Sequence, residues 1–407
     1  MSELKSSFSF AQSLDEALPL MPRHRERNKR NRSLTLDDLI DEQRLHNRMH
    51  GSSLDLLLMS YRYQEAFNRE QKLFLKRSLK PSKALDLWQL IFTALITRDH
   101  SSESATIYQS LEYAKKQFGV YMVGALRSFC QRMIEKKQSL RESIAKNPEI
   151  LLPETLIKRW SQHPFMNLTD IATPLSQRPE SGISAFDETL KWEKHSINDF
   201  KNQKLQALNE GSWLYLEYLF NEIQSISKSK NTLTLLDTCA APGGKLIGLL
   251  QWAIKNKIEI KAFATEAKFK RMERLSENLK SWNLNATTFL HAWGEGAKLP
   301  WTQESWDILL IDLPCSGSGT LSQRPDLLEK DWSALLPEIN SLQEKILTEI
   351  MSFSYEHAFV SICSIDPEEV DFISRLLKAT PIFYSSKTHG AAMEHIVAWK
   401  ISKNPLS

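Results

Sequence analysis

Apolar residues in the first part of the chain recur at the spacing of α-helices. Between Leu34 and about Lys137 glycine is scarce, and apolar side chains follow one another at intervals of three or four residues. One such series is Ile107, Leu111, Ala114 and Phe118, and another is Val123, Leu126, Cys130 and Met133. This spacing places an apolar stripe along each helix, and such stripes pack against one another. The pattern predicts an all-helical bundle with Cys130 packed in its core.

The pattern changes from Thr232 onward, where short apolar runs alternate with helical stretches. The runs typical of strands are Leu233–Asp237, Lys261–Thr265, Ala286–Leu290, Trp306–Asp312 and Ala358–Ile365. This alternation predicts an α/β Rossmann-like domain with a doubly wound, mostly parallel sheet. In such sheets ligands bind beyond the carboxyl ends of the strands, so the residues that close each run are the candidates for a site.

The chain has 407 residues, which is more than one hydrophobic core usually supports, so several domains are expected. Residues 1–33 are predicted to form a basic flexible arm, and residues 34–145 an all-α domain. Residues 146–212 contain several prolines and favour a connecting subdomain of unassigned role. Residues 213–407 then make up the α/β domain.

Charge is concentrated near the start of the chain. The formal net charge of the chain is +3. Residues 21–32 carry six basic residues and one acid, so the remaining residues have a net charge of −2. Such an arm is either a phosphate-binding tail or a solvating terminus. Apolar runs are far shorter than the roughly 20 residues of a membrane-spanning helix. We therefore expect a soluble, cytoplasmic protein without membrane association, and a monomer by default.

The first predicted strand leads into a glycine-containing turn, Asp237-Thr-Cys-Ala-Ala-Pro-Gly-Gly-Lys245. Glycines at this point allow the backbone to approach a ligand closely. The next strand ends at Glu266, where dinucleotide folds place an acid that binds ribose hydroxyls. The sequence contains no Gly-x-Gly-x-x-Gly and no Gly-Lys-Ser/Thr, so adenosine with a small charged tail fits better than a nicotinamide cofactor.

Two cysteines, Cys315 and Cys363, close two strands of the predicted sheet, and each is followed by serine. Cys239 lies within the glycine turn, where packing is its expected role. After Cys363, Asp366 and Pro367 are typical of a helix start. The positive end of that helix favours a thiolate, whereas the adjacent acids oppose it. The cysteine spacing indicates neither a zinc site nor a disulfide framework, and no metal is expected.

Three motifs occur in order: Ala-Ala-Pro-Gly-Gly-Lys, Asp-x-Pro-Cys-Ser-Gly-x-Gly with a following Arg-Pro-Asp, and Cys-Ser-Ile-x-Pro-Glu-Glu. Together they resemble the signatures of the Nol/Nop/Sun family of RNA cytosine-5 methyltransferases. The helical half, including residues 111–132, resembles the NusB-like RNA-binding domain of the RsmB-type members, which modify small-subunit ribosomal RNA in bacteria. The resemblance extends over most of the chain.

The resemblance implies S-adenosylmethionine as cofactor and RNA, in particular ribosomal RNA or an assembling small subunit, as partner. It implies that Cys363 adds to carbon 6 of cytosine, that Cys315 helps to remove the proton from carbon 5, and that Asp312 binds nitrogen 3. The implied cofactor-binding residues are Cys239, Ala240, Ala241, Pro242, Gly243, Gly244, Lys245, Glu266, Glu295 and Asp312. The implied RNA-binding residues are Lys245, Arg324 and Asp326.

The sequence also departs from the family pattern. Glu394-His-Ile-Val397 stands where Asp-Gly-Phe-Phe is expected, and Asn209-Glu-Gly-Ser212 where Gln-Asp-x-Ser is usual. These changes affect supporting and RNA-facing parts more than reacting atoms. They leave an alternative open, a catalytically inactive RNA-binding or ribosome-assembly protein that retains the methyltransferase fold. A NusB-like adaptor would account for the helical half alone.

Overall fold

The computed structural model describes residues 9–22, 50–75, 82–98, 103–163, 166–177, 183–196, 199, 203–296, 305–385 and 394–402. The chain divides into two compact units. The first consists of Met1–Arg178 with Arg324–Lys330, and the second of Pro179–Gln323 with Asp331–Ser407. Among the described helices, none combines the length and the apolar character needed to cross a bilayer.

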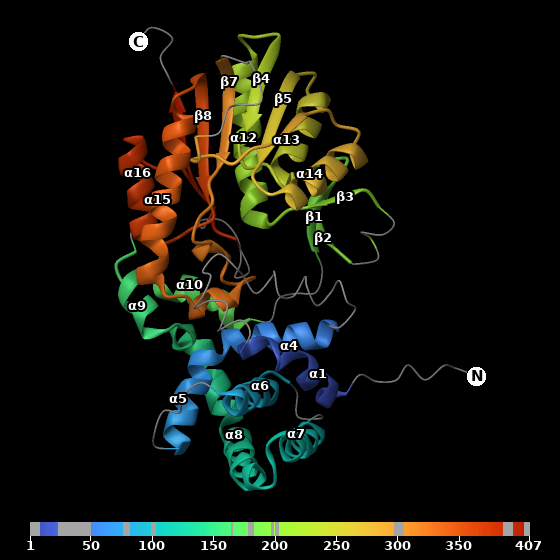
Figure 1. The fold of residues 1–407 in the computed structure, drawn as a ribbon, viewed down its shortest axis with the longest axis vertical. Helices are drawn as coiled ribbons and strands as arrows, with labels where there is room; N and C mark the ends of the chain where they lie inside the picture. Colours follow the sequence, from blue (N-terminus) through green and yellow to red (C-terminus); the bar gives the residue numbers. More distant parts are fainter. Residues whose placement is uncertain are drawn as a thin grey trace, which may run out of the picture. The chain divides into compact units, whose positions relative to one another are not determined.

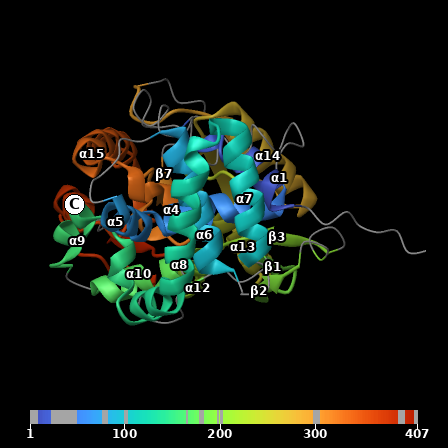
Figure 2. The same cartoon turned by 90° about the horizontal axis from the view of Figure 1, so that it is seen from below.

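The first unit is built from helices. They are α1 (Phe10–Ala17), α4 (Gly51–Arg62), α5 (Gln64–Leu75), α6 (Lys83–Thr97), α7 (Glu103–Phe118), α8 (Tyr121–Lys146), η2 (Pro148–Leu151), α9 (Glu154–Trp160) and α10 (Leu168–Ser176). Helix α6 is buried on all sides from Asp86 to Ile96. It contacts α4, α7 and α8, and Figure 2 shows it beside the last two. The helices between residues 51 and 146 confirm the predicted bundle.

Aromatic side chains fill the centre of this bundle. The rings of Phe67 and Phe129 lie nearly perpendicular with centroids 6.2 Å apart, and Phe92 packs against Phe67 at 5.6 Å. Cys130 is fully buried beside them, and burial raises the pKa of its thiol to about 12. The packing role predicted for Cys130 is therefore confirmed.

The predicted flexible arm is wrong for residues 10–17, which form helix α1. Ser9 and Gln12 form a capping box at its start, and Leu14 and Ala17 are completely buried. The apolar spacing of Phe10, Leu14 and Ala17 explains this packing, although the nearby positive charge dominates the composition of the segment. The six basic residues lie between positions 23 and 32, outside the described residues.

A short segment of the Asp-x-Pro-Cys region belongs to the helical unit. Residues 324–330 include the 3-10 helix η4 (Pro325–Glu329), which contacts α4. Pro325, Leu327 and Leu328 are buried there. This part of the motif therefore takes its surroundings from the N-terminal helices.

The second unit contains a seven-stranded sheet in the order β6-β5-β4-β7-β8-β10-β9 (Figure 1). Its strands are β4 (Thr232–Asp237), β5 (Glu259–Glu266), β6 (Thr287–Leu290), β7 (Ser305–Asp312), β8 (Ser354–Ile362), β9 (Phe383–Tyr384) and β10 (Val397–Ser402). The first five pair in parallel, whereas β10 is antiparallel to β8 and β9. The fold is Rossmann-like with a mostly parallel sheet, as predicted.

Helices cover both faces of this sheet. One apolar cluster joins the strands to α12 (Glu210–Ser227), α13 (Gly244–Lys255) and α14 (Phe269–Ser281). The other joins them to α15 (Trp332–Ile350) and α16 (Pro367–Leu377). Because both faces are covered, the buried residues of the central strands are mostly apolar.

Part of the predicted connecting subdomain forms a small antiparallel sheet. Its strands are β1 (Ile183–Asp187), β2 (Trp192–His195) and β3 (Leu205–Ala207), in the order β2-β1-β3. Phe186 of β1 is fully buried and packs between Trp213 and Trp282 of the large domain. The small sheet is thus part of the second unit.

The fold leaves no room for a side chain at Gly211, near the start of α12. A Cβ there would overlap the backbone carbonyl oxygen of Glu394. We predict that Gly211→Ala lowers the free energy of unfolding by about 1–3 kcal/mol, because one segment must shift. Urea denaturation measures the change.

Gly124 in α8 provides the control, since a Cβ there meets no atom within 4 Å. Gly124→Ala should raise stability by up to about 1 kcal/mol through helix propensity. A Gly211→Ala protein as stable as the wild type would contradict the expected overlap.

Candidate active site

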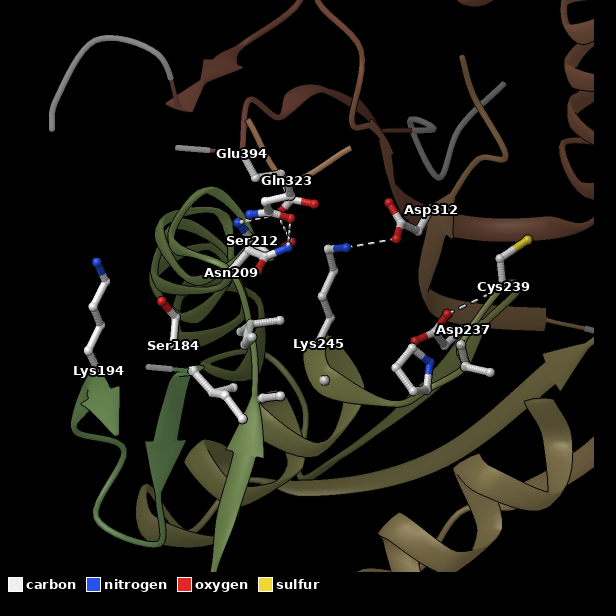
Figure 3. Close-up of a pocket in the computed structure, with 17 residues that line it drawn as sticks. Ser184, Lys194, Asn209, Ser212, Asp237, Cys239, Lys245, Asp312, Gln323 and Glu394 are labelled. Atoms are coloured by element: carbon white, nitrogen blue, oxygen red, sulfur yellow. Dashed lines mark hydrogen bonds and ion pairs between the residues drawn. The ribbon is translucent and has the colours of Figure 1, made fainter. Parts of the chain in front are cut away.

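The carboxyl ends of β4 and β7 lie side by side at the point where the strand order reverses. This is where doubly wound sheets bind ligands. A cavity of about 510 Å³ opens there (Figure 3), a size suited to a small molecule. It is lined by Ile183, Ser184, Lys194, Ala207, Leu208, Asn209, Ser212, Asp237, Cys239, Ala240, Ala241, Pro242, Gly244, Lys245, Asp312, Gln323 and Glu394.

The glycine turn forms the floor of this cavity. Gly243 has φ +105°, a left-handed conformation that favours glycine, and it directly precedes helix α13. A Cβ on Gly244 would lie 2.9 Å from Leu208 Cδ1. Arg271 donates a hydrogen bond of 2.6 Å to the carbonyl of Ala241 and so holds the turn from outside. The N-terminus of α13 therefore faces the cavity with its backbone accessible.

Lys245 and Asp312 form an ion pair across the cavity. Lys245 Nζ lies 2.7 Å from Asp312 Oδ2, and Ser361 donates to Asp312 Oδ1 at 2.9 Å. Burial lowers the pKa of Lys245, but the carboxylates of Asp312 and Glu394 outweigh it and raise that pKa. The lysine is therefore an ammonium group at neutral pH.

Asp237 ends strand β4 beneath this pair. Burial, followed by the negative charge of Asp312, raises the pKa of Asp237 to about 7. Its Oδ1 accepts a long hydrogen bond of 3.4 Å from Cys239 N. Asp237 thus changes its protonation state close to neutral pH.

The structure brings Cys315 and Cys363 together. Their Sγ atoms are 3.1 Å apart, because β7 and β8 are parallel neighbours with Asp312 opposite Ser361. The hydrogen bond to Cys363, then burial, raises the pKa of the Cys315 thiol well above its ordinary value. Lys245 is close enough to Cys363 for their charges to interact. Neither cysteine is among the residues that line the cavity described above.

Hydroxyl groups and a buried acid support the two cysteine loops. Ser318 Oγ lies 2.8 Å from Ser364 Oγ and accepts from Ile365 N. Glu369 Oε1 accepts from Ser316 N at 3.1 Å and is fully buried. Asp366 caps α16, as the sequence predicts, through bonds to the backbone of Glu368 and Glu369. The two loops are thus joined by direct hydrogen bonds.

Residues 225–400 match the model of a family described as 16S rRNA methyltransferase RsmB/F. This matching part of the chain is called the RsmB/F domain. A relative from Escherichia coli O6:H1, named Ribosomal RNA small subunit methyltransferase B, is 27% identical over 314 residues, 70% of this chain and 69% of the relative. The protein of that name from Shigella flexneri is 26% identical over the same shares of both chains.

A solved structure is similar to the whole chain. The crystal structure of PH0851 aligns with a TM-score of 0.63 and 15% identity, and covers 97% of this chain and 99% of its own. At this identity the likeness establishes the fold alone. It agrees with the Rossmann-like sheet of the RsmB/F domain.

Seven of the ten predicted cofactor residues line the cavity, whereas Gly243, Glu266 and Glu295 lie outside its lining. Glu266 is buried at the end of β5, where Oε1 accepts from Lys268 N at 3.1 Å and Oε2 lies 3.5 Å from Arg271 Nε. Glu295 is exposed between two glycines with positive φ, Gly294 and Gly296. Their predicted contacts with ribose and adenine stay predictions.

The predicted RNA-facing pair Arg324 and Asp326 lies in the N-terminal unit. Asp326 is 1% exposed, and its Oδ2 lies 3.2 Å from Arg324 Nη2. The carboxylate therefore orients the guanidinium group. Contact with RNA by Arg324 stays a prediction.

Sequence reasoning missed several residues that line the cavity, notably Asp237, Asn209, Gln323 and Glu394. Asp237 could have been found, because it ends a predicted strand. Asn209 donates a hydrogen bond of 3.0 Å to Gln323 across 114 positions of sequence. No local pattern reveals such a contact, so only the tertiary structure identifies this wall.

The raised pKa of Asp237 predicts a pH-dependent stability. The folded RsmB/F domain keeps this proton up to about pH 7, whereas the unfolded chain releases it near pH 4, at about the ordinary pKa. The free energy of unfolding therefore falls as pH rises through this window, and the loss is complete above it. Asp237→Asn should show a smaller drop in melting temperature between pH 5 and pH 8 than the wild type.

Asp307→Asn is the matched control, because hydrogen bonds from Lys230 and Thr234 outweigh partial burial and lower the pKa of Asp307. It should leave the drop between pH 5 and pH 8 unchanged. Equal drops in the wild type and Asp237→Asn would mean that Asp237 titrates normally.

Proposed function

We propose that this chain is an S-adenosylmethionine-dependent RNA cytosine-5 methyltransferase that acts on small-subunit ribosomal RNA. The observation that carries the proposal is the 3.1 Å approach of two thiols at the ends of adjacent strands. Beside them stands the Lys245–Asp312 ion pair. A binding protein has no need of two opposed thiols, whereas this chemistry uses both.

Carbon 5 of cytosine is a weak nucleophile until a second group adds to the ring. The Cys363 thiolate forms a bond to carbon 6, and the ring electrons move so that carbon 5 becomes nucleophilic. Carbon 5 then takes the methyl group that S-adenosylmethionine would supply, and the bond from that methyl group to the sulfonium sulfur would break with its electron pair left on sulfur. Cys315 removes the remaining proton from carbon 5, and the electron pair of that bond expels Cys363 as the carbon–sulfur bond breaks.

Lys245 and Asp312 act on the other edge of the base. Addition at carbon 6 places negative charge on nitrogen 3, which needs a hydrogen-bond donor. The Lys245 ammonium supplies this donor, and Asp312 acts at nitrogen 3 by holding the ammonium at 2.7 Å. The Ser361 hydroxyl fixes the other oxygen of Asp312. The pair is thus arranged before the substrate binds.

The residues around the turn fit S-adenosylmethionine. The Gly243–Gly244 turn exposes backbone at the start of α13, and a side chain at Gly244 would crowd Leu208. Cys239, Ala240, Ala241 and Pro242 complete a wall of small side chains. The turn would hold the methionine end, with Glu266 and Glu295 toward the nucleoside. When bound, the cofactor supplies an electrophilic methyl group.

The RNA must present an unpaired or flipped cytidine, because stacked bases are out of reach of such a site. We propose that the N-terminal helices are a NusB-like RNA-binding domain, and that the guanidinium group of Arg324, oriented by Asp326, contacts a phosphate. An enzyme of this kind would work in the cytoplasm on ribosomal RNA or an assembling subunit.

Cysteine replacement tests the chemistry. With labelled S-adenosylmethionine and unmodified small-subunit ribosomal RNA, Cys363→Ala should transfer no methyl group, because no adduct forms. Cys315→Ala should accumulate a protein–RNA adduct, because the step that releases Cys363 stalls. Denaturing gels and bisulfite sequencing of the RNA report the two outcomes.

Cys130→Ala serves as the control, since Cys130 is buried in the other unit. It should keep transfer as long as the protein folds. A wild type that methylates no RNA would support the non-catalytic alternative. Full activity of Cys363→Ala would overturn the assigned nucleophile.

A further inference from the structure

The two segments in which this sequence departs from the family pattern contact each other. Glu394 Oε2 accepts hydrogen bonds from Ser212 Oγ at 2.6 Å and from Ser212 N at 3.2 Å. Glu394 is 8% exposed and Ser212 4%. The carboxylate thus satisfies a backbone N–H in the first turn of α12, and one of its oxygens is fixed.

The backbone around Glu394 is also tied to the cysteine loops. His395 N donates to the carbonyl of Gly319 at 2.9 Å, and Gly319 N donates to the carbonyl of Cys363 at 3.0 Å. Ser385 Oγ donates to the carbonyl of Glu394. A Cβ on Gly211 or Gly319 would collide with this segment. Glu394 is therefore held at a set position relative to the proposed nucleophile.

The second oxygen of Glu394, Oε1, is available inside the cavity. Within the part of the chain that the structure describes, it forms no hydrogen bond, and Glu394 lines the cavity together with Lys245 and Asp312. Figure 3 shows Glu394 and Lys245 along the same opening. Asp312 differs, because Lys245 and Ser361 each occupy one of its oxygens. Glu394 thus offers an acceptor to a ligand beside the donor offered by Lys245.

A protein that places a hydrogen-bond donor next to an acceptor can distinguish cytosine from uracil. Cytosine presents an acceptor at nitrogen 3 next to the donor amino group on carbon 4, and uracil presents the reverse. We propose that Glu394 is a specificity-determining residue whose Oε1 accepts a hydrogen bond from the 4-amino group of the target cytosine, while Lys245 donates to nitrogen 3. This inference rests on the proposed function. It explains why a fixed carboxylate lies beside an ion pair that is already complete.

A chemical double-mutant cycle tests this contact. Bisulfite sequencing first locates the cytidine that the wild type methylates. RNAs are then prepared with cytosine or pyrimidin-2-one, which lacks the amino group, at that position. Single-turnover kcat/KM is measured for the wild type and Glu394→Gln on both RNAs. In the variant, the amide oxygen can still accept from Ser212, whereas the amide nitrogen opposes the amino group of the base.

The ratio of kcat/KM for cytosine over pyrimidin-2-one is the decisive quantity. We expect it to be about 10- to 100-fold larger for the wild type than for Glu394→Gln, because only the wild type reads the amino group. Comparing this ratio between the two proteins cancels the different intrinsic reactivity of the two rings. Equal ratios in both proteins would overturn the proposal, even if both are slow.

The failure of this inference is distinguishable from failure of the proposed function. If the proposed function is wrong, the wild type methylates no cytidine, and bisulfite sequencing finds no modified position. A Glu394→Gln protein with an unchanged ratio but a raised KM for S-adenosylmethionine would place the carboxylate at the cofactor instead, which also overturns the proposal.

Two further variants complete the design. Glu222→Gln removes a carboxylate from α12 that binds Lys400 and Tyr218 outside the cavity lining, and it should keep the wild-type ratio. Glu394→Asp keeps the charge but withdraws the acceptor by one methylene, so its ratio should fall between those of the wild type and Glu394→Gln. If Glu394→Gln does not fold, a wild-type ratio in Glu394→Asp contradicts the proposal.

Discussion

The parallel pairing of β4, β7 and β8 is the constraint on which the site depends. Leu310 of β7 lies opposite Asp237 of β4, and Asp312 lies opposite Ser361 of β8. Parallel strands end at the same edge of a sheet, so residues from three distant parts of the sequence meet there. Successive side chains alternate between the two faces of a strand, so a shift of one residue would turn Asp312 away from Lys245.

Charge balance sets the properties of this edge. The ammonium group of Lys245 lies among the carboxylates of Asp312, Asp237 and Glu394. In a partly enclosed site each charge depends on its neighbours, because the protein screens charges less than bulk water does. Lys245 stays protonated, whereas Asp237 holds its proton to about pH 7. The arrangement favours a ligand that can both accept and donate hydrogen bonds.

The loops that carry the two cysteines are supported from several directions. Hydroxyl groups of Ser316, Ser318 and Ser364 and the buried Glu369 join them. The segment that follows Gln323 packs with helices of the first unit, where residues 324–330 contact α4. A change in the helical unit therefore alters the surroundings of a segment only a few residues beyond Cys315.

The sequence by itself determined the elements and most of the chemistry. Apolar runs predicted the five parallel strands, the helical spacing predicted the bundle, and polar residues at strand ends indicated the turn at Gly243 and the cysteines. These features are local, since periodicity and strand-end position are written in consecutive residues. The tertiary structure alone decided the small sheet of β1–β3 and the contact of Ser212 with Glu394. That contact joins positions 182 residues apart, and it forms because the fold brings the start of α12 beside the segment that precedes β10. No local sequence pattern predicts this contact, because it depends on how the helices and the sheet pack.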